Sequence, residues 1–130
     1  MRVLHRAGVE GASLLRVYTM AGDRVGTTSL AEALVTAARR RGLRGATVLP
    51  ALAGFGRHGL DVPLSVLLYR PERQPLVVEL VDEPEALRRF FEEDVSRLDR
   101  WGRVATIERL TLHAYHATPD APGETGGGAA

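Results

Sequence analysis

The sequence contains no cysteine and no lysine, and each absence excludes a class of chemistry. Without cysteine there is no disulfide, no thiolate nucleophile and no thiolate metal site. Without lysine there is no Schiff-base chemistry, and no lysine of the kind that binds phosphate in Walker-type sites. All 17 basic residues are arginine. Planar, bidentate recognition of phosphate or carboxylate groups therefore stays available.

The chain also has little net charge and no long apolar run. A net charge of +1 gives no reason to expect a nucleic-acid partner, because nucleic-acid binders are usually strongly basic. No apolar stretch approaches the roughly 18 residues needed to span a bilayer, so we do not expect a membrane protein. The first residues lack the continuous apolar segment of a secretory signal, and we therefore predict a cytoplasmic protein.

The two ends differ from the middle in composition. Residues 1–12 show no apolar periodicity, and residues 117–130 are mostly glycine, proline, alanine and small polar residues. Segments of this kind bury too little apolar surface to offset the entropy lost on folding. The sequence therefore predicts a flexible arm at 1–12, one folded domain at 13–116 and a disordered tail at 117–130.

Local signals place the helices and strands of this domain. Ser29 and Glu32 form a capping box, Gly42 stands where a helix-ending glycine belongs, and 82–85 forms a second capping box. Pro50 cannot donate a backbone hydrogen bond, which places its strand at a sheet edge or a bulge. The expected order is strand 14–20, helix 29–41, strand 45–55, strand 75–82, helix 84–101 and strand 103–115, with a further short strand at 63–70.

This order predicts an α+β fold, a ferredoxin-like βαββαβ sandwich whose antiparallel sheet carries both helices on one face. The other face of the sheet then has no cover. Alternation along the strands places Leu14, Tyr18, Val77 and Val81 on that face. Exposed apolar patches of several hundred Å² are unusual on monomers, so we expect this face to be covered by other subunits.

Arg16 and Glu79 lie in the middle of two strands that should be central neighbours in this fold. A charged residue between apolar neighbours on a central strand is either solvated or paired, since an unpaired buried charge is costly. The sequence predicts a cross-strand Arg16–Glu79 pair inside the subunit contact.

The histidines do not predict a metal site. His113 and His116 are three residues apart on a predicted strand, which points them to opposite faces, whereas chelation needs one face. His58 has no second ligand nearby in sequence. The common nucleophile, zinc-protease and phosphate-loop motifs are also absent, so the sequence predicts no catalytic residue, no metal and no identifiable cofactor.

The segment Gly54–Phe55–Gly56–Arg57–His58 allows two interpretations. In the first, the glycines relieve strain at a strand end and Phe55 packs nearby. In the second, glycine amides approach an anion and Arg57 adds charge. The local sequence alone favours the first.

Several segments follow one another as in the uncharacterised bacterial PII-like family (domain of unknown function 190), which the chain resembles over about residues 13–115. They are "LLRVY", "DRVG", "LAEALVTAARRRGLRGATVL", "AGFG" and "PLVVELVDEPEALRRF". The resemblance implies a trimer like those of PII signalling proteins and no catalysis. It further implies adenine nucleotides in the clefts between subunits, and a partner protein at the loop from Gly54 to Pro63, or as far as Ser65. The glycine-rich segment then becomes the base of a signalling loop.

Two departures from the PII pattern concern the phosphate site. The segment before the last strand, Arg100–Trp101–Gly102–Arg103, is shorter and poorer in glycine than the PII phosphate loop. Pro50–Ala51 stands where relatives often have a basic residue. In the segment before the last strand, Arg103 is the basic residue that we expect to contact an effector. Relatives are often encoded near fluoride exporters, so the resemblance also suggests a membrane transporter or channel as partner.

Three functions remain open at this point. The leading hypothesis is a homotrimeric PII-like regulator that binds a small anionic effector, such as an adenine nucleotide. The second is an isomerase-type enzyme on the same fold, with Tyr18, His58 or His113 as acid or base. The third is a structural or metal-tolerance trimer resembling the CutA proteins.

Overall fold

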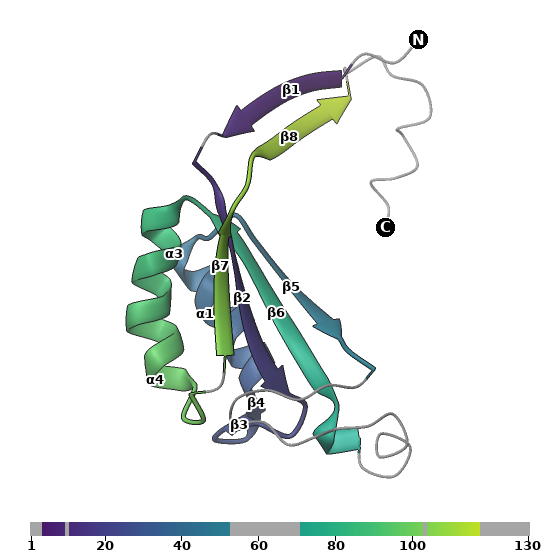
Figure 1. The fold of residues 1–130 in the computed structure, drawn as a ribbon, viewed down its shortest axis with the longest axis vertical. Helices are drawn as coiled ribbons and strands as arrows, with labels where there is room; N and C mark the ends of the chain where they lie inside the picture. Colours follow the sequence, from purple (N-terminus) through teal and green to yellow (C-terminus); the bar gives the residue numbers. More distant parts are fainter. Residues whose placement is uncertain (1–3, 10, 53–70, 103, 118–130) are drawn as a thin grey trace.

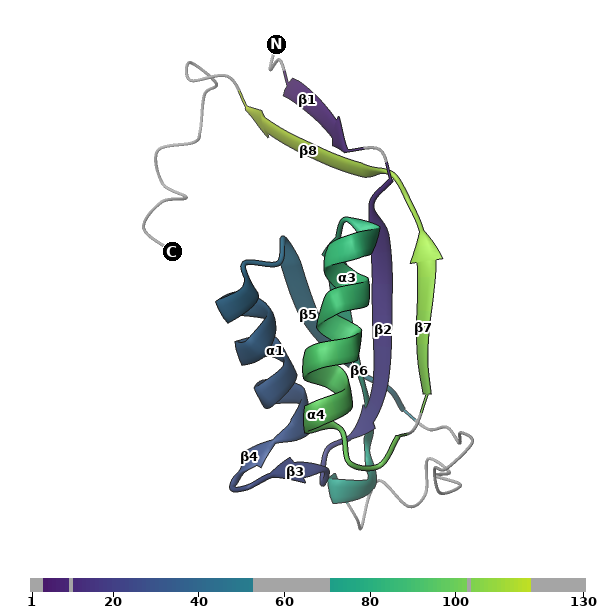
Figure 2. The ribbon, with the colours of Figure 1, turned by 90° about the vertical axis from the view of Figure 1, so that its left-hand side faces the viewer.

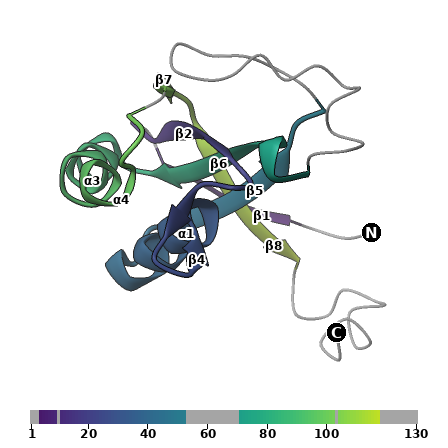
Figure 3. The same ribbon diagram turned by 90° about the horizontal axis from the view of Figure 1, so that it is seen from below.

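A computed structural model describes residues 4–9, 11–52, 71–102 and 104–117. Its main sheet is antiparallel and has the strand order β5 (Gly45–Pro50), β6 (Pro75–Asp82), β2 (Ser13–Met20) and β7 (Val104–Arg109). One helix is α1 (Leu30–Arg41), and the other is built from α3 (Pro84–Phe90), η2 (Phe91–Val95) and α4 (Ser96–Leu98). Both lie on the same face of the sheet (Figure 3). The predicted α+β, ferredoxin-like arrangement is confirmed.

The alternation along β2 explains which face the helices cover. Leu15 and Val17 are 0% and 1% exposed, and they stand opposite Leu80 and Val78 on β6. Burial of each such side chain contributes about 1.5–3 kcal/mol before entropy is counted. The helices complete this core with Leu30, Ala31, Leu34, Ala38, Leu87, Phe90, Val95 and Leu98.

Helix α1 begins and ends within one residue of its predicted limits. The hydroxyl of Ser29 accepts a hydrogen bond from the backbone N–H of Glu32 at 3.1 Å. At the other end Gly42 has φ 74°, and the N–H of Leu43 donates to the carbonyl of Ala38 at 3.0 Å. The serine and the glycine satisfy backbone groups that a helix leaves unpaired at its ends. A short hairpin, β3 (Arg24–Val25) and β4 (Thr28–Ser29), precedes the helix.

Strand β5 is an edge of the sheet, as Pro50 predicted. Pro50 is the last residue of the strand and stands opposite Leu76. Directly after it, the N–H of Ala51 donates to the carbonyl of Pro75 at 2.9 Å. Because donors alternate along the strand, the nitrogen of Pro50 faces the open edge, and its missing N–H leaves no hydrogen bond to β6 unmade.

The second helix differs from the continuous helix that the sequence predicted. Residues 91–95 form a π-helical turn, in which the N–H of Ser96 donates to the carbonyl of Phe91. The second capping box is not formed either. Glu83 occupies the N-cap without a side-chain hydrogen bond, while the Asp82 carboxylate accepts from the N–H groups of Glu83 (2.6 Å) and Arg44 (3.1 Å). Asp82 therefore ties the end of β6 to the segment after α1.

The ends of the domain also differ from the prediction. Residues 4–9, expected within an arm without regular structure, form strand β1 (Leu4–Val9). The single strand expected at 103–115 is divided into β7 and β8 (Leu112–Ala117). β1 and β8 pair antiparallel from Leu4↔Ala117 to Val9↔Leu112 and project from one end of the main sheet (Figures 1 and 2). Their pairing joins segments about a hundred residues apart, which no local pattern reveals.

The predicted strand 63–70, the glycine-rich loop and the tail after residue 117 lie outside the described residues. Within the described part, no helix is both long enough and apolar enough to cross a membrane.

Candidate functional site

The candidate site is the face of the main sheet opposite the helices, here called the open face. Two rows of paired residues cross it. A polar row runs Thr47–Glu79–Arg16–Thr106. Next to it an apolar row runs Leu49–Val77–Tyr18.

Arg16 is the centre of the polar row. Its Nε donates to Oε2 of Glu79 at 2.9 Å, and its Nη1 donates to Oε1 of Glu108 at 2.6 Å. The side chains of Arg16 and Glu79 are 34% and 24% exposed. The hydrogen bonds to Glu79 and then Glu108 raise the pKa of the Arg16 guanidinium above its already high ordinary value. Arg16 is therefore a fixed positive charge, and two carboxylates hold it across three strands.

The predicted contact between Arg16 and Glu79 is confirmed, since the two residues stand opposite each other on neighbouring central strands. Glu108 was missed. Its signal was present, because Glu108 follows Thr106 by two residues on a strand and so shares its face. Only the pairing of β7 with β2 shows that this face also carries Arg16.

The apolar row is exposed in part. Tyr18 is 38% exposed and Leu49 is 43% exposed, while Val77 between them is half-buried. Leu14, which the sequence also placed on this face, is only 8% exposed. The apolar patch is therefore narrower than predicted and lies toward the β5 edge of the sheet.

Backbone hydrogen bonds hold the described residues on both sides of the loop that follows β5. The chain re-enters the described part through a turn, η1 (Pro71–Arg73). The N–H of Gly22 donates to the carbonyl of Glu72 at 2.7 Å, and a Cβ on Gly22 would lie 2.9 Å from that oxygen. Glycine is therefore required at position 22 for this close approach. The predicted site residues of the loop, Gly54, Phe55, Gly56, Arg57 and His58, lie outside the described residues.

The segment before β7 attaches to the same end of the sheet as that loop, because β7 begins opposite Tyr18 and β5 ends opposite Leu76. The Asp99 carboxylate orders this segment by accepting from the N–H groups of Trp101 (3.0 Å) and Gly102 (3.2 Å). Arg103, the predicted basic residue, lies outside the described part.

Two residues suggested for an enzyme are held apart. Tyr18 pairs near the start of β7, and His113 stands opposite Gly8 in the projecting hairpin. The hairpin strand with His113 follows the end of β7, which pairs with Ser13 at the start of β2. Ser13 and Tyr18 lie roughly 17 Å apart along β2. His58 lies outside the described residues. In the ranges that the structure covers, no three His, Asp or Glu side chains gather as a metal site.

A family model described as "Uncharacterized ACR, COG1993", the DUF190 family, matches residues 12–111. The chain belongs to the DUF190 family. Among curated proteins, the UPF0166 protein of Aquifex aeolicus (strain VF5) is 36% identical to this DUF190 protein over 80 residues. That match spans 62% of this chain and 75% of the Aquifex protein.

Solved structures of a PII-like protein share the fold of this DUF190 chain. The apo form of CPII from Thiomonas intermedia K12, a nitrogen regulatory PII-like protein, superposes with a TM-score of 0.53 at 12% identity, covering 86% of this chain and 99% of CPII. CPII bound to ADP, AMP and bicarbonate gives a TM-score of 0.52 at 15% identity, covering 86% and 91%. The fold is therefore PII-like, in agreement with the resemblance in the sequence.

Proposed function

We propose that this DUF190 protein is a homotrimeric PII-like regulator without catalytic activity that works in the cytoplasm. It binds a small anionic effector, of which adenine nucleotides are the first candidates, in the clefts between subunits. It contacts a partner, a membrane transporter or channel, through the loop that follows β5. Residues Gly54–His58 and Arg103 contact the effector or the partner, while Arg16 and Glu79 stand in the subunit contact.

The observation that carries this proposal is the open face of a PII-like sheet. An apolar row with Tyr18 38% exposed and Leu49 43% exposed lies beside a charge cluster whose members already satisfy one another. Burying Arg16 against another subunit costs less because its guanidinium is already paired with Glu79 and Glu108, which leave one negative charge in excess. A symmetric contact between copies of the chain accounts for both rows.

The anionic nature of the effector is supported by arginine chemistry. The loop after β5 and the segment before β7 attach to the same end of the sheet. Each brings an arginine next to glycine, Arg57 in the first segment and Arg103 in the second. Arginine forms bidentate hydrogen bonds with phosphate, and glycine lets backbone N–H groups approach an anion closely. Binding of ADP, AMP and bicarbonate by CPII gives the first compounds to test.

Light scattering and thermal shift test the two halves of the proposal separately. We expect a solution mass three times the chain mass of 14.1 kDa. A monomer at micromolar concentration would refute the trimer. We also expect ATP, ADP or AMP to raise the melting temperature, since a ligand at a hundred times its Kd stabilises the native state by about 2.7 kcal/mol. Stabilisation by divalent metal ions alone would instead favour a CutA-like protein.

Arginine variants locate the effector. Arg57→Ala and Arg103→Ala should each weaken nucleotide binding and leave the melting temperature of the free protein nearly unchanged. Arg88→Ala is the matched control, because Arg88 is 52% exposed on the second helix and is paired there with Glu85 and Glu92. Equal affinities in all three variants would refute the assigned roles of Arg57 and Arg103.

A further inference from the structure

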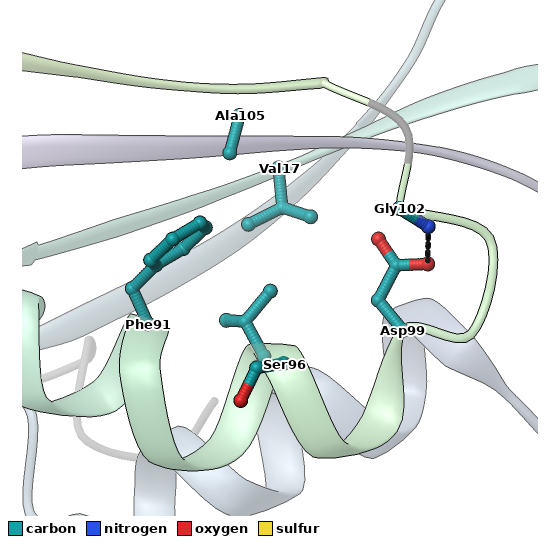
Figure 4. A pocket seen from close by; sticks show the side chains of 7 residues that line it. Val17, Phe91, Ser96, Asp99, Gly102 and Ala105 are labelled. Carbon is teal, nitrogen blue, oxygen red and sulfur yellow. Dashed lines mark hydrogen bonds between the residues drawn. The ribbon is translucent and has the colours of Figure 1, made fainter. Parts of the chain in front are cut away.

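A cavity lies on the helix side of the sheet, away from the open face. It has a volume of about 320 Å³ and is lined by Val17, Phe91, Val95, Ser96, Asp99, Gly102 and Ala105. Figure 4 shows these side chains around the space between the π-helical turn, β2 and β7. The volume is at the lower end of the range for small-molecule sites, which begins at about 300 Å³.

The floor and walls of this cavity are apolar. Val17 and Val95 are 1% and 4% exposed and stay in place as part of the core. Phe91 is 38% exposed although it follows Phe90, which is 0% exposed. The cavity therefore offers one aromatic ring above a fixed aliphatic floor, which suits the apolar body of a small ligand.

The π-helical turn gives the cavity its shape. Because Ser96 N–H bonds to the carbonyl of Phe91, five residues earlier, one extra residue is accommodated in the turn. The carbonyl of Glu92, which would receive that N–H in an α-helix, is bonded instead by the Ser96 hydroxyl. Turns of this kind occur frequently at functional sites. Here the turn lets Phe90 enter the core while Phe91 faces the cavity.

Asp99 supplies the polar end of the cavity. Its Oδ1 accepts the N–H groups of Trp101 and Gly102, at 3.0 and 3.2 Å. Its Oδ2 has no hydrogen-bond partner among the residues that the structure describes, and in Figure 4 this oxygen lies on the side of the carboxylate that faces Val17, across the space from Phe91. The Ser96 hydroxyl already donates a hydrogen bond to the backbone carbonyl of Glu92. The available polar group is thus a carboxylate oxygen whose partner oxygen is held by the backbone.

We infer that this cavity binds a small amine, a molecule with one ammonium or amino group on a compact apolar body. The body lies between Phe91 and the floor formed by Val17 and Val95, and the amino group donates to Asp99 Oδ2. A charge-assisted hydrogen bond of this kind is stronger than a neutral one. A carboxylate at the same position is rejected, because two negative charges would face each other in a partly enclosed site. This site is separate from the anionic-effector site proposed above and does not depend on it.

Fluorescence of Trp101, the only tryptophan, gives a label-free test, because Trp101 is two residues from Asp99 and its backbone N–H donates to the Asp99 carboxylate. The probes are 2-phenylethylamine, its neutral isostere 2-phenylethanol and the anion 3-phenylpropionate, titrated into the full chain. We expect saturable binding of the amine in the millimolar range, as is usual for a ligand of about nine non-hydrogen atoms. The alcohol should bind several-fold more weakly and the anion should not bind. Equal responses to all three probes, or none, would overturn the inference.

Two variants and a control locate the amine. Asp99→Asn keeps an oxygen for the backbone N–H groups and removes the charge. It should therefore weaken the binding of 2-phenylethylamine about tenfold and change the Kd of 2-phenylethanol by less than twofold. Asp82→Asn is the control, since Asp82 also accepts two backbone N–H groups but lies outside the cavity. Ala105→Leu fills the cavity and should abolish the binding of both probes.

NMR of the same samples separates cavity binding from two other outcomes. We expect the amine to shift the amide signals of Gly102 and Ala105. Should Ala105→Leu fail to fold, as judged by circular dichroism, Phe91→Ala replaces it and should weaken both probes. Probe binding that Asp99→Asn leaves unchanged would overturn the inference. So would concentration-dependent Gly102 and Ala105 signals with no probe binding, because another copy of the chain would then fill the cavity.

Discussion

Arg41 joins the two helices, and its removal should measurably destabilise the fold. It is the last residue of α1, and its Nε donates to Oδ2 of Asp94 at 2.5 Å. Its Nη2 donates to Oε1 of Glu93 at 2.7 Å. These hydrogen bonds, to Glu93 first and then Asp94, raise the pKa of the Arg41 guanidinium. The Asp94 side chain is only 10% exposed, so it depends on its partners to offset the loss of water.

The cost of Arg41→Met follows from that burial. Removing one partner of a fully buried ion pair costs about 3–5 kcal/mol, whereas exposed pairs contribute about 0–1 kcal/mol. Arg41 is 30% exposed, and Asp94 keeps a weaker contact with Arg97 at 3.4 Å. We therefore expect a loss of about 1–2 kcal/mol in the free energy of unfolding. That corresponds to a fall of about 4–8 °C in melting temperature for a domain of this size.

Urea denaturation followed by circular dichroism measures this loss, with every variant at one protein concentration because assembly shifts apparent stability. Arg40→Met is the matched control, since no ion pair of Arg40 is present within the described residues and its side chain is exposed. Asp94→Asn and the double variant complete a cycle that isolates the pair. If Arg41→Met and Arg40→Met unfold within about 0.5 kcal/mol of each other, which is the usual range for surface substitutions, the argument from burial is wrong.

Three further predictions concern other parts of the chain. Gly42→Ala should cost about 1 kcal/mol because Gly42 has φ 74°. Gly45→Ala, at an equally open position without positive φ, should leave the stability nearly unchanged. Equal urea midpoints for Gly42→Ala and Gly45→Ala would contradict this prediction. The hydrogen bond from Arg88 lowers the pKa of Glu85, so Glu85 stabilises the fold above its unfolded pKa of about 4.3 and this contribution is lost as pH falls through the folded value. Wild-type urea midpoints should therefore fall more steeply below pH 5 than those of Glu85→Gln, and parallel curves would refute the assignment. Finally, amides 55–63 should exchange hydrogen faster than amides 76–81, and their exchange should slow when an effector binds. The reason is that three glycines in six residues raise the entropy of the free loop. Equal protection of the two groups of amides without effector would contradict the signalling role of the loop.

Local patterns in the sequence determined those structural features that arise from interactions between residues close together in the chain. Ser29 and Gly42 mark the ends of α1, because caps act on backbone groups within a few residues. Pro50 indicates an edge strand through its own missing N–H. The pairing of Arg16 with Glu79 was also predictable, since the order of elements leaves few arrangements and alternation sets which side chains share a face.

Tertiary structure alone decided the features that depend on partners distant in the chain. Glu108 joins Arg16 only through the register of β7 on β2. β1 exists as a strand because β8 pairs with it across the length of the chain. The π-helical turn keeps the apolar spacing of an ordinary helix, so the sequence predicted one, and the insertion is visible only in the hydrogen bond from Ser96 to Phe91. The physical reason is common to all three: periodicity records which face of an element is apolar, whereas register, pairing and local insertions are set by what packs against that face.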